Sequence, residues 1–401
     1  INKLQLRIAY LLAVFGSGIG WIAMMFGVFS ADFWVAEAYP FLSAYANPHF
    51  PLGLAILLWI FTLAQKSTSL GGFNISFWNR INVFLGSIVL GIVMPFGVVI
   101  VAMVLGFLGI WEIAESYQQN GLHRVSSIPE VTFLAVIVCL GGGPILLYYY
   151  WVSHTDPLLA GWNMQNLTPA PPLWDFMISF LPVLIFAVPG AVLVAQNRIK
   201  PLRILVVWAI LGLLLLWIPF GLQRRFILGL YIPFAGLTSF GIDRLMKMTN
   251  KRHFAILIGI FGLATLTNLT VILVAFTGIQ TMDQSIYITQ GESRAFDWLI
   301  KNTEEEAVIL TGPDTGLFLP AHTGRSVFYG HPFETVDAEN QKKKVSDFFR
   351  YPNSENSLTL LEASDYVFWG PRENDISSEN VRIELPVIYE TAGVTIFRVT
   401  R

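Results

Sequence analysis

The chain has 401 residues, of which 54% are apolar and only 13% charged, and its mean hydropathy is +0.59. A soluble globular domain carries about 25% charged residues. This composition therefore excludes a soluble enzyme, a disordered chain and a free nucleic-acid binder.

The charges divide the chain into two parts. Residues 1–280 contain 14 Lys or Arg against 8 Asp or Glu, whereas residues 281–401 contain 11 against 19. This asymmetry predicts a basic transmembrane helical domain over 1–280 and an acidic soluble domain over 281–401. The single cysteine, Cys139, excludes a disulfide framework and a cysteine-based zinc site. The chain opens on Ile1 without a signal-peptide pattern, which suggests an N-terminally truncated sequence.

Apolar runs that can cross a bilayer fill the first part of the chain. A transmembrane helix needs about 20 mostly apolar residues, and seven runs are candidates: 8–29, 50–65, 130–152, 173–195, 204–220, 226–245 and 254–279. A longer apolar run, 82–114, contains Met94-Pro95-Phe96-Gly97. Because Pro and Gly end helices, this run is either one long tilted helix or two short helices joined by a tight turn.

The placement of Lys and Arg favours two helices over 82–114. Cytoplasmic loops of membrane proteins are enriched in these residues. Two crossings with a cytoplasmic N-terminus place 12 Lys or Arg inside and 2 outside, whereas one crossing gives 6 and 8. The sequence therefore predicts a polytopic α-helical membrane protein with about nine crossings and a small extracytoplasmic C-terminal α/β domain.

The first predicted outer loop carries two carboxylates, Asp32 and Glu37. A carboxylate at the membrane surface could act as the general base that accepts a proton from an acceptor hydroxyl. The pair could also hold a divalent metal, although no cofactor is otherwise indicated. Alternatively, these are ordinary solvated acids or charges favoured near a helix N-terminus.

Two further outer-loop residues are candidates for substrate binding. His49 lies between Pro48 and Phe50 at a predicted helix start, and Asp156 precedes Pro157 in the loop from Ser153 to Pro172. The alternative for His49 is an interfacial position, and for Asp156 a turn or helix-capping role.

An arginine doublet, Arg224 and Arg225, is the exception to the charge rule, because it lies in a short link on the predicted outer side. Guanidinium groups bind phosphate through paired hydrogen bonds. We interpret the doublet as the binding site for the phosphate of a lipid-linked donor. The alternative is that both side chains simply extend to the membrane interface.

The C-terminal part alternates helix and strand patterns, which is typical of a small α/β sandwich. Helices are predicted over 293–302 and 337–350, and strands over 307–311, 326–329, 365–369, 385–389 and 394–399.

Polar residues cluster around the second of these strands. Arg325 precedes it, and His331 and Glu334 follow it. Ligand sites in parallel sheets lie beyond the carboxyl ends of strands, so we expect His331 and Glu334 to bind substrate, and we take Arg325 as a further candidate for the same role. The alternative is loop packing and domain docking.

Taken together, these features resemble the membrane glycosyltransferases of the GT-C fold, and most closely a bacterial branch related to aminoarabinose transferases and protein mannosyltransferases. The resemblance is carried in order by Asp32…Glu37…Asn47-Pro48-His49-Phe50, the helix pair at Pro95, Asp156-Pro157…Trp162…Gln165-Asn166…Pro171-Pro172, Gln223-Arg224-Arg225-Phe226 and Thr323-Gly324-Arg325…Gly330-His331…Glu334-Thr335.

The resemblance implies a cell-envelope enzyme in the lipid bilayer that moves a sugar from a polyprenyl-phosphate-linked donor to an acceptor on the outer face. In that fold the leading catalytic acid lies in the first outer loop, so the resemblance leaves open whether the main base precedes Ile1 and whether this fragment is active alone.

Two other functions remain open. One is a non-enzymatic flippase or transporter of a lipid-linked substrate, although internal repeats and mid-membrane charges typical of transporters are not evident. The other is a membrane-anchored binding module whose soluble domain does the work. Convergence of the polar outer-loop residues on one cleft would favour the enzyme. The sequence identifies neither the sugar nor the acceptor.

Overall fold

A computed structural model describes residues 2–69, 75–120, 129–248, 253–352, 354–377 and 383–400. The chain forms two compact units. The helical unit comprises Ile1–Trp151 and Leu167–Val274, and the α/β unit comprises Val152–Asn166 and Ala275–Arg401. The stretch 152–166 thus groups with the C-terminal residues, although it lies within the predicted transmembrane domain.

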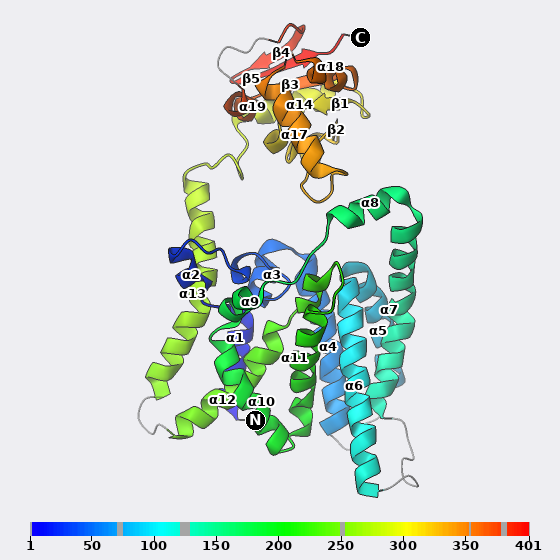
Figure 1. Cartoon of the computed structure of the whole chain (residues 1–401), viewed down its shortest axis with the longest axis vertical. Helices are drawn as coiled ribbons and strands as arrows, with labels where there is room; N and C mark the ends of the chain where they lie inside the picture. The colour runs from blue at the N-terminus through cyan, green and yellow to red at the C-terminus, as the bar shows by residue number, and fades with distance from the viewer. Residues whose placement is uncertain are drawn as a thin grey trace. The chain divides into compact units, whose positions relative to one another are not determined.

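Helices and short 3₁₀ turns make up the described part of the helical unit (Figure 1). They are α1 (Lys3–Phe15), α2 (Gly20–Met25), η1 (Ala31–Phe33), α3 (Pro40–Ala46), α4 (His49–Ser69), α5 (Phe77–Val93), α6 (Pro95–Asn120), α7 (Glu130–Thr155), α9 (Leu173–Phe180), α10 (Val183–Gln196), η3 (Lys200–Leu202), α11 (Arg203–Leu216), η4 (Gln223–Ile227), α12 (Tyr231–Met248) and α13 (His253–Gln280).

The chain is a multi-pass membrane protein by the length and composition of its helices. Among the described residues, five helical stretches are long and apolar enough to cross a bilayer: His49–Ser67, Pro95–Gln118, Glu130–Thr155, Gln223–Met246 and Gly259–Gln280. Helices α9 and α10 meet at 83° and together form a possible sixth span, while α5 is shorter. The larger number of nine crossings stays a prediction.

The apolar run 82–114 is broken where the sequence predicts. Helix α5 ends at Val93 and α6 begins at Pro95, with the N–H of Met94 bonded to the carbonyl of Leu90 (2.7 Å). Pro95 lacks an N–H and cannot continue the ladder of α5. The two helices pack against each other.

The run 8–29 differs from the prediction, because it is not one continuous helix. Helix α1 ends at Phe15 and α2 begins only at Gly20. Between them the hydroxyl of Ser17 donates to the carbonyl of Ala264 in α13 (3.0 Å), and the hydroxyl of Tyr231 donates to the carbonyl of Ser17 (2.9 Å). Contacts from distant helices, which hydropathy does not reveal, therefore hold the break.

Helices α10 and α12 approach closely through glycine. A Cβ on Gly190 would overlap the carbonyl of Leu237, and one on Gly241 would overlap the carbonyl of Phe186. Small residues at helix crossings permit such backbone contact in membranes. Both glycines are therefore packing requirements.

Gly190→Ala is expected to lower the free energy of unfolding by about 1–3 kcal/mol, because the added methyl group forces the two helices apart. Denaturant unfolding of the full chain in detergent micelles measures this change. Gly143→Ala in α7 is the matched control, since a Cβ there meets no atom of the described chain within 4 Å. Equal unfolding midpoints for the two variants would contradict the proposed packing role.

The α/β unit is built on a mixed five-stranded sheet in the order β2-β1-β3-β5-β4. Its strands are β1 (Val308–Leu310), β2 (Ser326–Val327), β3 (Tyr366–Trp369), β4 (Val387–Thr391) and β5 (Val394–Arg398). Strands β2, β1 and β3 are parallel, and β5 is antiparallel to both β3 and β4. Its helices are α8 (Pro157–Gln165), α14 (Gln290–Asn302), α15 (Pro313–Gly316), α16 (Leu319–Thr323), α17 (Ala338–Arg350), α18 (Glu355–Glu362) and α19 (Pro371–Ile376).

Each face of this sheet has its own apolar core. Phe296 and Leu299 of α14 cluster with Phe368 of β3, whereas Phe348 of α17 clusters with Val367 of the same strand. Adjacent residues of a strand point to opposite faces. The predicted α/β sandwich is therefore present as a mixed sheet between helices.

Candidate functional site

The arginine doublet and the first predicted outer loop lie together in the helical unit. Arg224 and Arg225 belong to η4, directly before α12. The N–H of Gly229 donates to the carbonyl of Glu37 (2.8 Å), so backbone bonding joins the segment after η4 to the loop 31–39. Two stretches nearly 190 residues apart in sequence thereby form one polar cluster.

Arg225 and Glu37 form an ion pair within this cluster. The distance from Arg225 Nη1 to Glu37 Oε1 is 2.7 Å, and the side chains are 39% and 8% exposed. The carboxylate is buried while the guanidinium keeps an open side. Arg225 therefore has donors available to a ligand in addition to the one that it gives Glu37.

Arg224 is held differently, against an aromatic ring. Its guanidinium carbon lies 4.8 Å from the centroid of Trp34, and its backbone N–H donates to the carbonyl of Thr168 (2.9 Å). Within the described parts of the chain, Arg224 Nε and Thr168 Oγ1 are buried and have no hydrogen-bond partner. A buried charged donor without an acceptor is costly. An anion bound here would supply that acceptor.

Asp32, the other carboxylate of the loop, is fully buried. It accepts hydrogen bonds from the N–H of Gly20 (3.0 Å) and the hydroxyl of Ser30 (2.6 Å), and its own N–H donates to Ser179 Oγ (3.2 Å). Asp175 accepts from the same Ser179 hydroxyl at 3.0 Å. This network ties η1 to α9, so we assign Asp32 to holding the loop and take only Glu37 forward as a candidate base.

The other two outer-loop candidates occupy helix starts. His49 is the first residue of α4 and is exposed, with its ring 4.4 Å edge-on from that of Phe50. Asp156 caps α8 by accepting from the N–H groups of Leu158 (2.8 Å) and Leu159 (3.2 Å). These positions match the local alternatives for both residues.

Within the α/β unit, residues at the end of α8 form hydrogen bonds to the backbone of the loop 331–337. The Gln165 side chain donates to the carbonyl of Thr335 (2.6 Å) and accepts from the N–H of Asp337 (2.8 Å). The Asn166 amide donates to the carbonyl of Phe333 (2.7 Å). We call these three bonds the α8 clasp. It brings part of the predicted outer loop 153–172 to the predicted binding stretch.

His331 and Glu334 lie on the clasped loop and are exposed. Nδ1 of His331 accepts from the N–H groups of Phe333 (3.2 Å) and Glu334 (3.3 Å), which shapes the turn. Both side chains are exposed, so a ligand can reach Nε2 of the ring and the Glu334 carboxylate.

Arg325, in contrast, is buried and used by the fold. Its Nη2 donates to the carbonyls of Ile300 (3.1 Å) and Thr303 (2.7 Å), and its Nε donates to Thr303 Oγ1 (3.0 Å). These acceptors lie at the C-terminal end of α14, where carbonyls lack helical partners. These hydrogen bonds explain why an arginine is buried at this position without invoking a substrate-binding role.

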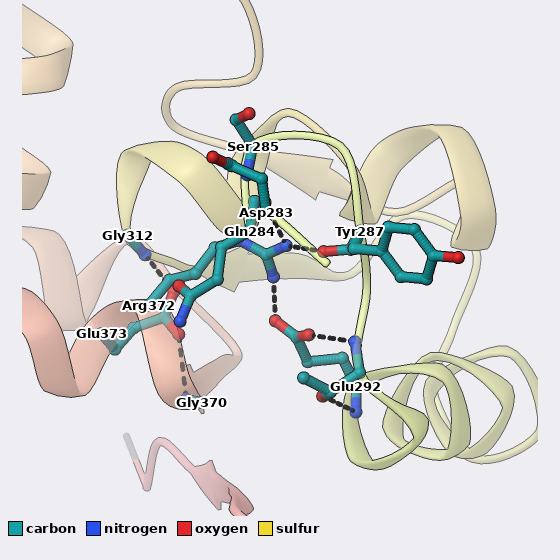
Figure 2. A network of polar contacts seen from close by, with 10 residues as sticks. Asp283, Gln284, Ser285, Tyr287, Glu292, Gly312, Gly370, Arg372 and Glu373 are labelled. Atoms are coloured by element: carbon teal, nitrogen blue, oxygen red, sulfur yellow. Dashed lines mark hydrogen bonds and ion pairs between the residues drawn. The ribbon is translucent and has the colours of Figure 1, made fainter. Parts of the chain in front are cut away.

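A second polar network, which the sequence analysis missed, surrounds Arg372 in the α/β unit (Figure 2). Its guanidinium pairs with Glu292 and donates to the carbonyls of Gln284 (2.8 Å) and Tyr287 (2.5 Å). Glu292 also accepts from the N–H of Thr289 (2.7 Å) as part of the capping box of α14. Arg372 and Glu292 are 80 residues apart in the sequence, so no local sequence pattern predicts that they pair.

The neighbouring Glu373 points the other way and is also buried (Figure 2). Its carboxylate accepts from the N–H groups of Gly312 (2.9 Å) and Gly370 (2.9 Å). Burial raises the pKa of the Glu373 carboxyl above its usual value near 4.5. The folded unit therefore keeps this proton at pH values where the unfolded chain has lost it.

A raised pKa in the folded state predicts that this contribution to stability falls as pH rises from about 4.5 through the folded pKa. Glu373→Gln cannot titrate and should remove this dependence, with an additional pH-independent loss because its NH₂ group cannot accept from one of the two backbone N–H groups. We expect the stability of the variant relative to wild type to increase with pH. Urea-dependent pulse proteolysis of both full chains at pH 5 and pH 7.5 measures their free energies of unfolding. A pH-independent difference would show that Glu373 does not titrate in this window.

Among the described residues, no group of three or more His, Cys, Asp or Glu side chains is placed to hold a metal ion.

Comparison with known proteins gives likenesses to solved structures only. No protein-family profile matches the chain, and no curated protein matches it. The fold is similar to the crystal structure of the Archaeoglobus fulgidus oligosaccharyltransferase in complex with zinc and sulfate, with a TM-score of 0.49 and 15% sequence identity. The match covers 92% of this chain and 53% of the archaeal protein, so the chain spans about half of that protein's length.

Proposed function

We propose that this protein is a membrane glycosyltransferase that takes a sugar from a polyprenyl-phosphate-linked donor and transfers it to an acceptor on the outer face of the membrane. One observation carries the proposal. The two Arg residues that break the charge rule lie together with Glu37 and Trp34, and the buried Nε of Arg224 has no hydrogen-bond partner among the residues that the structure describes.

This cluster has the groups that displacement of a lipid phosphate requires. During transfer, the bond between the anomeric carbon and the phosphate oxygen breaks, and the acceptor oxygen forms a bond to that carbon. The departing phosphate keeps the electron pair, and Arg224 and Arg225 stabilise its charge. The acceptor proton goes to a carboxylate, for which Glu37 is the candidate because it lies 2.7 Å from Arg225.

The same phosphate explains how Glu37 becomes available. A phosphate that binds the open side of Arg225 competes with Glu37 for the guanidinium donors. Donor binding would therefore loosen the ion pair and free the carboxylate at the moment when it is needed. In this scheme the donor prepares its own site.

The proposed topology determines the side of the membrane on which sugar transfer takes place. The 12-to-2 distribution of Lys and Arg supports a cytoplasmic N-terminus and outer positions for the cluster and the α/β unit. His331 and Glu334 of the α8-clasped loop are candidates for contacts with the acceptor.

The test uses the full chain in proteoliposomes that contain a polyprenyl-phosphate hexose labelled in the sugar. We expect the protein to break the sugar–phosphate bond, seen as loss of label from the lipid fraction with release of polyprenyl phosphate. A flippase would change the leaflet of the labelled lipid and leave that bond intact. Intact donor in the presence of acceptor-containing membrane extract would overturn the proposal.

A further inference from the structure

A cavity of about 440 Å³, lined by both polar and apolar side chains, opens among helices α6, α10 and α11, and none of its lining residues belongs to the Arg224–Arg225 cluster. Its walls include Trp111, Glu115 and Gln118 of α6, Arg198 after the end of α10, and Arg203 and Val206 of α11. Aromatic and aliphatic side chains share this space with two guanidinium groups. The proposed function uses none of them.

An ion pair between Arg203 and Glu115 forms one wall of the cavity. Arg203 donates to both carboxylate oxygens of Glu115 (2.6 and 3.0 Å), and its guanidinium carbon lies 5.2 Å from the ring centroid of Trp111. Bidentate pairing with aromatic stacking holds both side chains in place. Arg203 is therefore a wall of the cavity, and its charge is already compensated.

Two further cations lie near this space: Arg198 lines the cavity itself, and Lys200 lines an adjoining pocket that shares Trp111 and Arg203 with it. Both side chains are exposed, and Lys200 belongs to η3, which joins α10 to α11. The remaining acid nearby is Glu112, which lines a small adjoining pocket with Lys200 and Arg203. Among the residues that line these two pockets, Arg198 and Lys200 outnumber Glu112, the one carboxylate that Arg203 does not already pair, so an anion is the complementary ligand.

The cavity lies at the polar end of a membrane span. The candidate span Pro95–Gln118 ends at Gln118, which itself lines the cavity. A ligand in this position is at the depth of lipid headgroups.

Exposed apolar side chains continue from the cavity toward the middle of the span. On α10 they are Ile185, Val188 and Val192, and on α11 they are Ile210 and Leu214. Their spacing of three or four residues places each set on one helix face. Figure 1 shows α11 between α6 and α10, and α11 packs on both. This apolar stripe suits an acyl chain.

We propose that the cavity binds an anionic phospholipid from the leaflet at this end of the helical unit. Arg198 and Lys200 hold the headgroup phosphate, Gln118 contributes a neutral hydrogen bond, and an acyl chain lies along the stripe of α10 and α11. By the proposed topology this is the cytoplasmic leaflet. The site does not depend on sugar transfer.

The test measures lipid binding to the purified full chain by native mass spectrometry and by the thermal shift in micelles, with phosphatidylglycerol and phosphatidylcholine as the two probes. Each basic residue at a membrane surface adds about fivefold to the affinity for anionic lipid. We expect Arg198→Gln to weaken phosphatidylglycerol binding about fivefold and Arg198→Gln with Lys200→Gln about 25-fold. Phosphatidylcholine binding should not change.

Arg244→Gln is the matched control, since Arg244 is exposed on α12 and does not line the cavity. An equal loss of phosphatidylglycerol binding in this control would mean that general surface charge attracts the lipid, and would overturn the proposal. So would unchanged binding in the double variant. If millimolar inorganic phosphate displaced labelled phosphatidylglycerol as effectively as unlabelled phosphatidylglycerol does, the cavity would be a site for a soluble anion. That result would also overturn the proposal. Melting temperatures in phosphatidylcholine report whether each variant is folded.

Discussion

Replacing Arg224 and Arg225 together with alanine is expected to weaken binding of the polyprenyl-phosphate donor at least about 100-fold, and to abolish detectable transfer. A hydrogen bond to a charged group contributes about 1.5–3 kcal/mol, and the double variant removes at least two of them. Equilibrium binding of labelled donor to the full chain in micelles measures the loss.

The single variants separate the two arginines. Arg225→Ala leaves Glu37 buried without its ion-pair partner, so we expect this variant to lose stability as well as donor affinity. Arg224→Ala removes a guanidinium whose Nε has no partner in the described part of the chain, and should lower donor affinity while the unfolding midpoint is preserved. Arg224→Lys keeps the charge but not the planar donor pair, and should restore only part of the affinity.

Arg244→Ala serves as the control for loss of a surface cation on the same unit, and should bind donor like wild type. Donor affinity that is unchanged in the Arg224→Ala/Arg225→Ala variant would remove the phosphate role of the doublet, and with it the main support for sugar transfer.

Arg372→Met is expected to destabilise the α/β unit by about 3–5 kcal/mol. The side chains of Arg372 and Glu292 are 3% and 1% exposed, and removal of one partner leaves an uncompensated buried charge. Urea-dependent pulse proteolysis of the full chain, with detection of fragments from the C-terminal region, gives the change in unfolding free energy.

A second substitution makes this prediction specific to the ion pair. Glu292→Gln removes the charge but keeps an acceptor for the N–H of Thr289, as capping boxes tolerate Gln. The double variant Arg372→Met with Glu292→Gln should therefore lose less stability than Arg372→Met alone. Arg294→Met, at an exposed position of α14, controls for the new apolar side chain. A double variant as unstable as the single one would argue that Arg372 acts through packing alone.

Much of the fold follows from local rules in the sequence. Pro95 lacks the N–H that would continue the ladder of α5, and Gly97 follows closely, so the division of the run 82–114 was predictable from the sequence. The alternation of helices and strands after residue 290 likewise predicted the five strands and the helices α14 and α17 of the α/β unit, but not its shorter helices. Such features depend on a few adjacent residues and need no knowledge of distant contacts.

Other features depend on partners far along the chain. The break after Phe15 is held by Ala264 and Tyr231, which hydropathy of the run 8–29 does not reveal. The sequence marked Glu37 and Arg225 as separate candidates for catalysis and phosphate binding, but only the fold pairs them. It also gave Asp32 and Glu37 equal standing, although one is enclosed by hydrogen bonds and the other faces the doublet.

The α8 clasp has a consequence for biogenesis. Gln165 precedes Thr335 by 170 residues, so the ribosome synthesises Gln165 well before the loop to which it hydrogen-bonds. Helices α9 to α13 are all synthesised in the interval. Closure of the clasp must therefore be a late step of maturation, and a protein cut before residue 331 would leave Gln165 and Asn166 without the backbone that they hold.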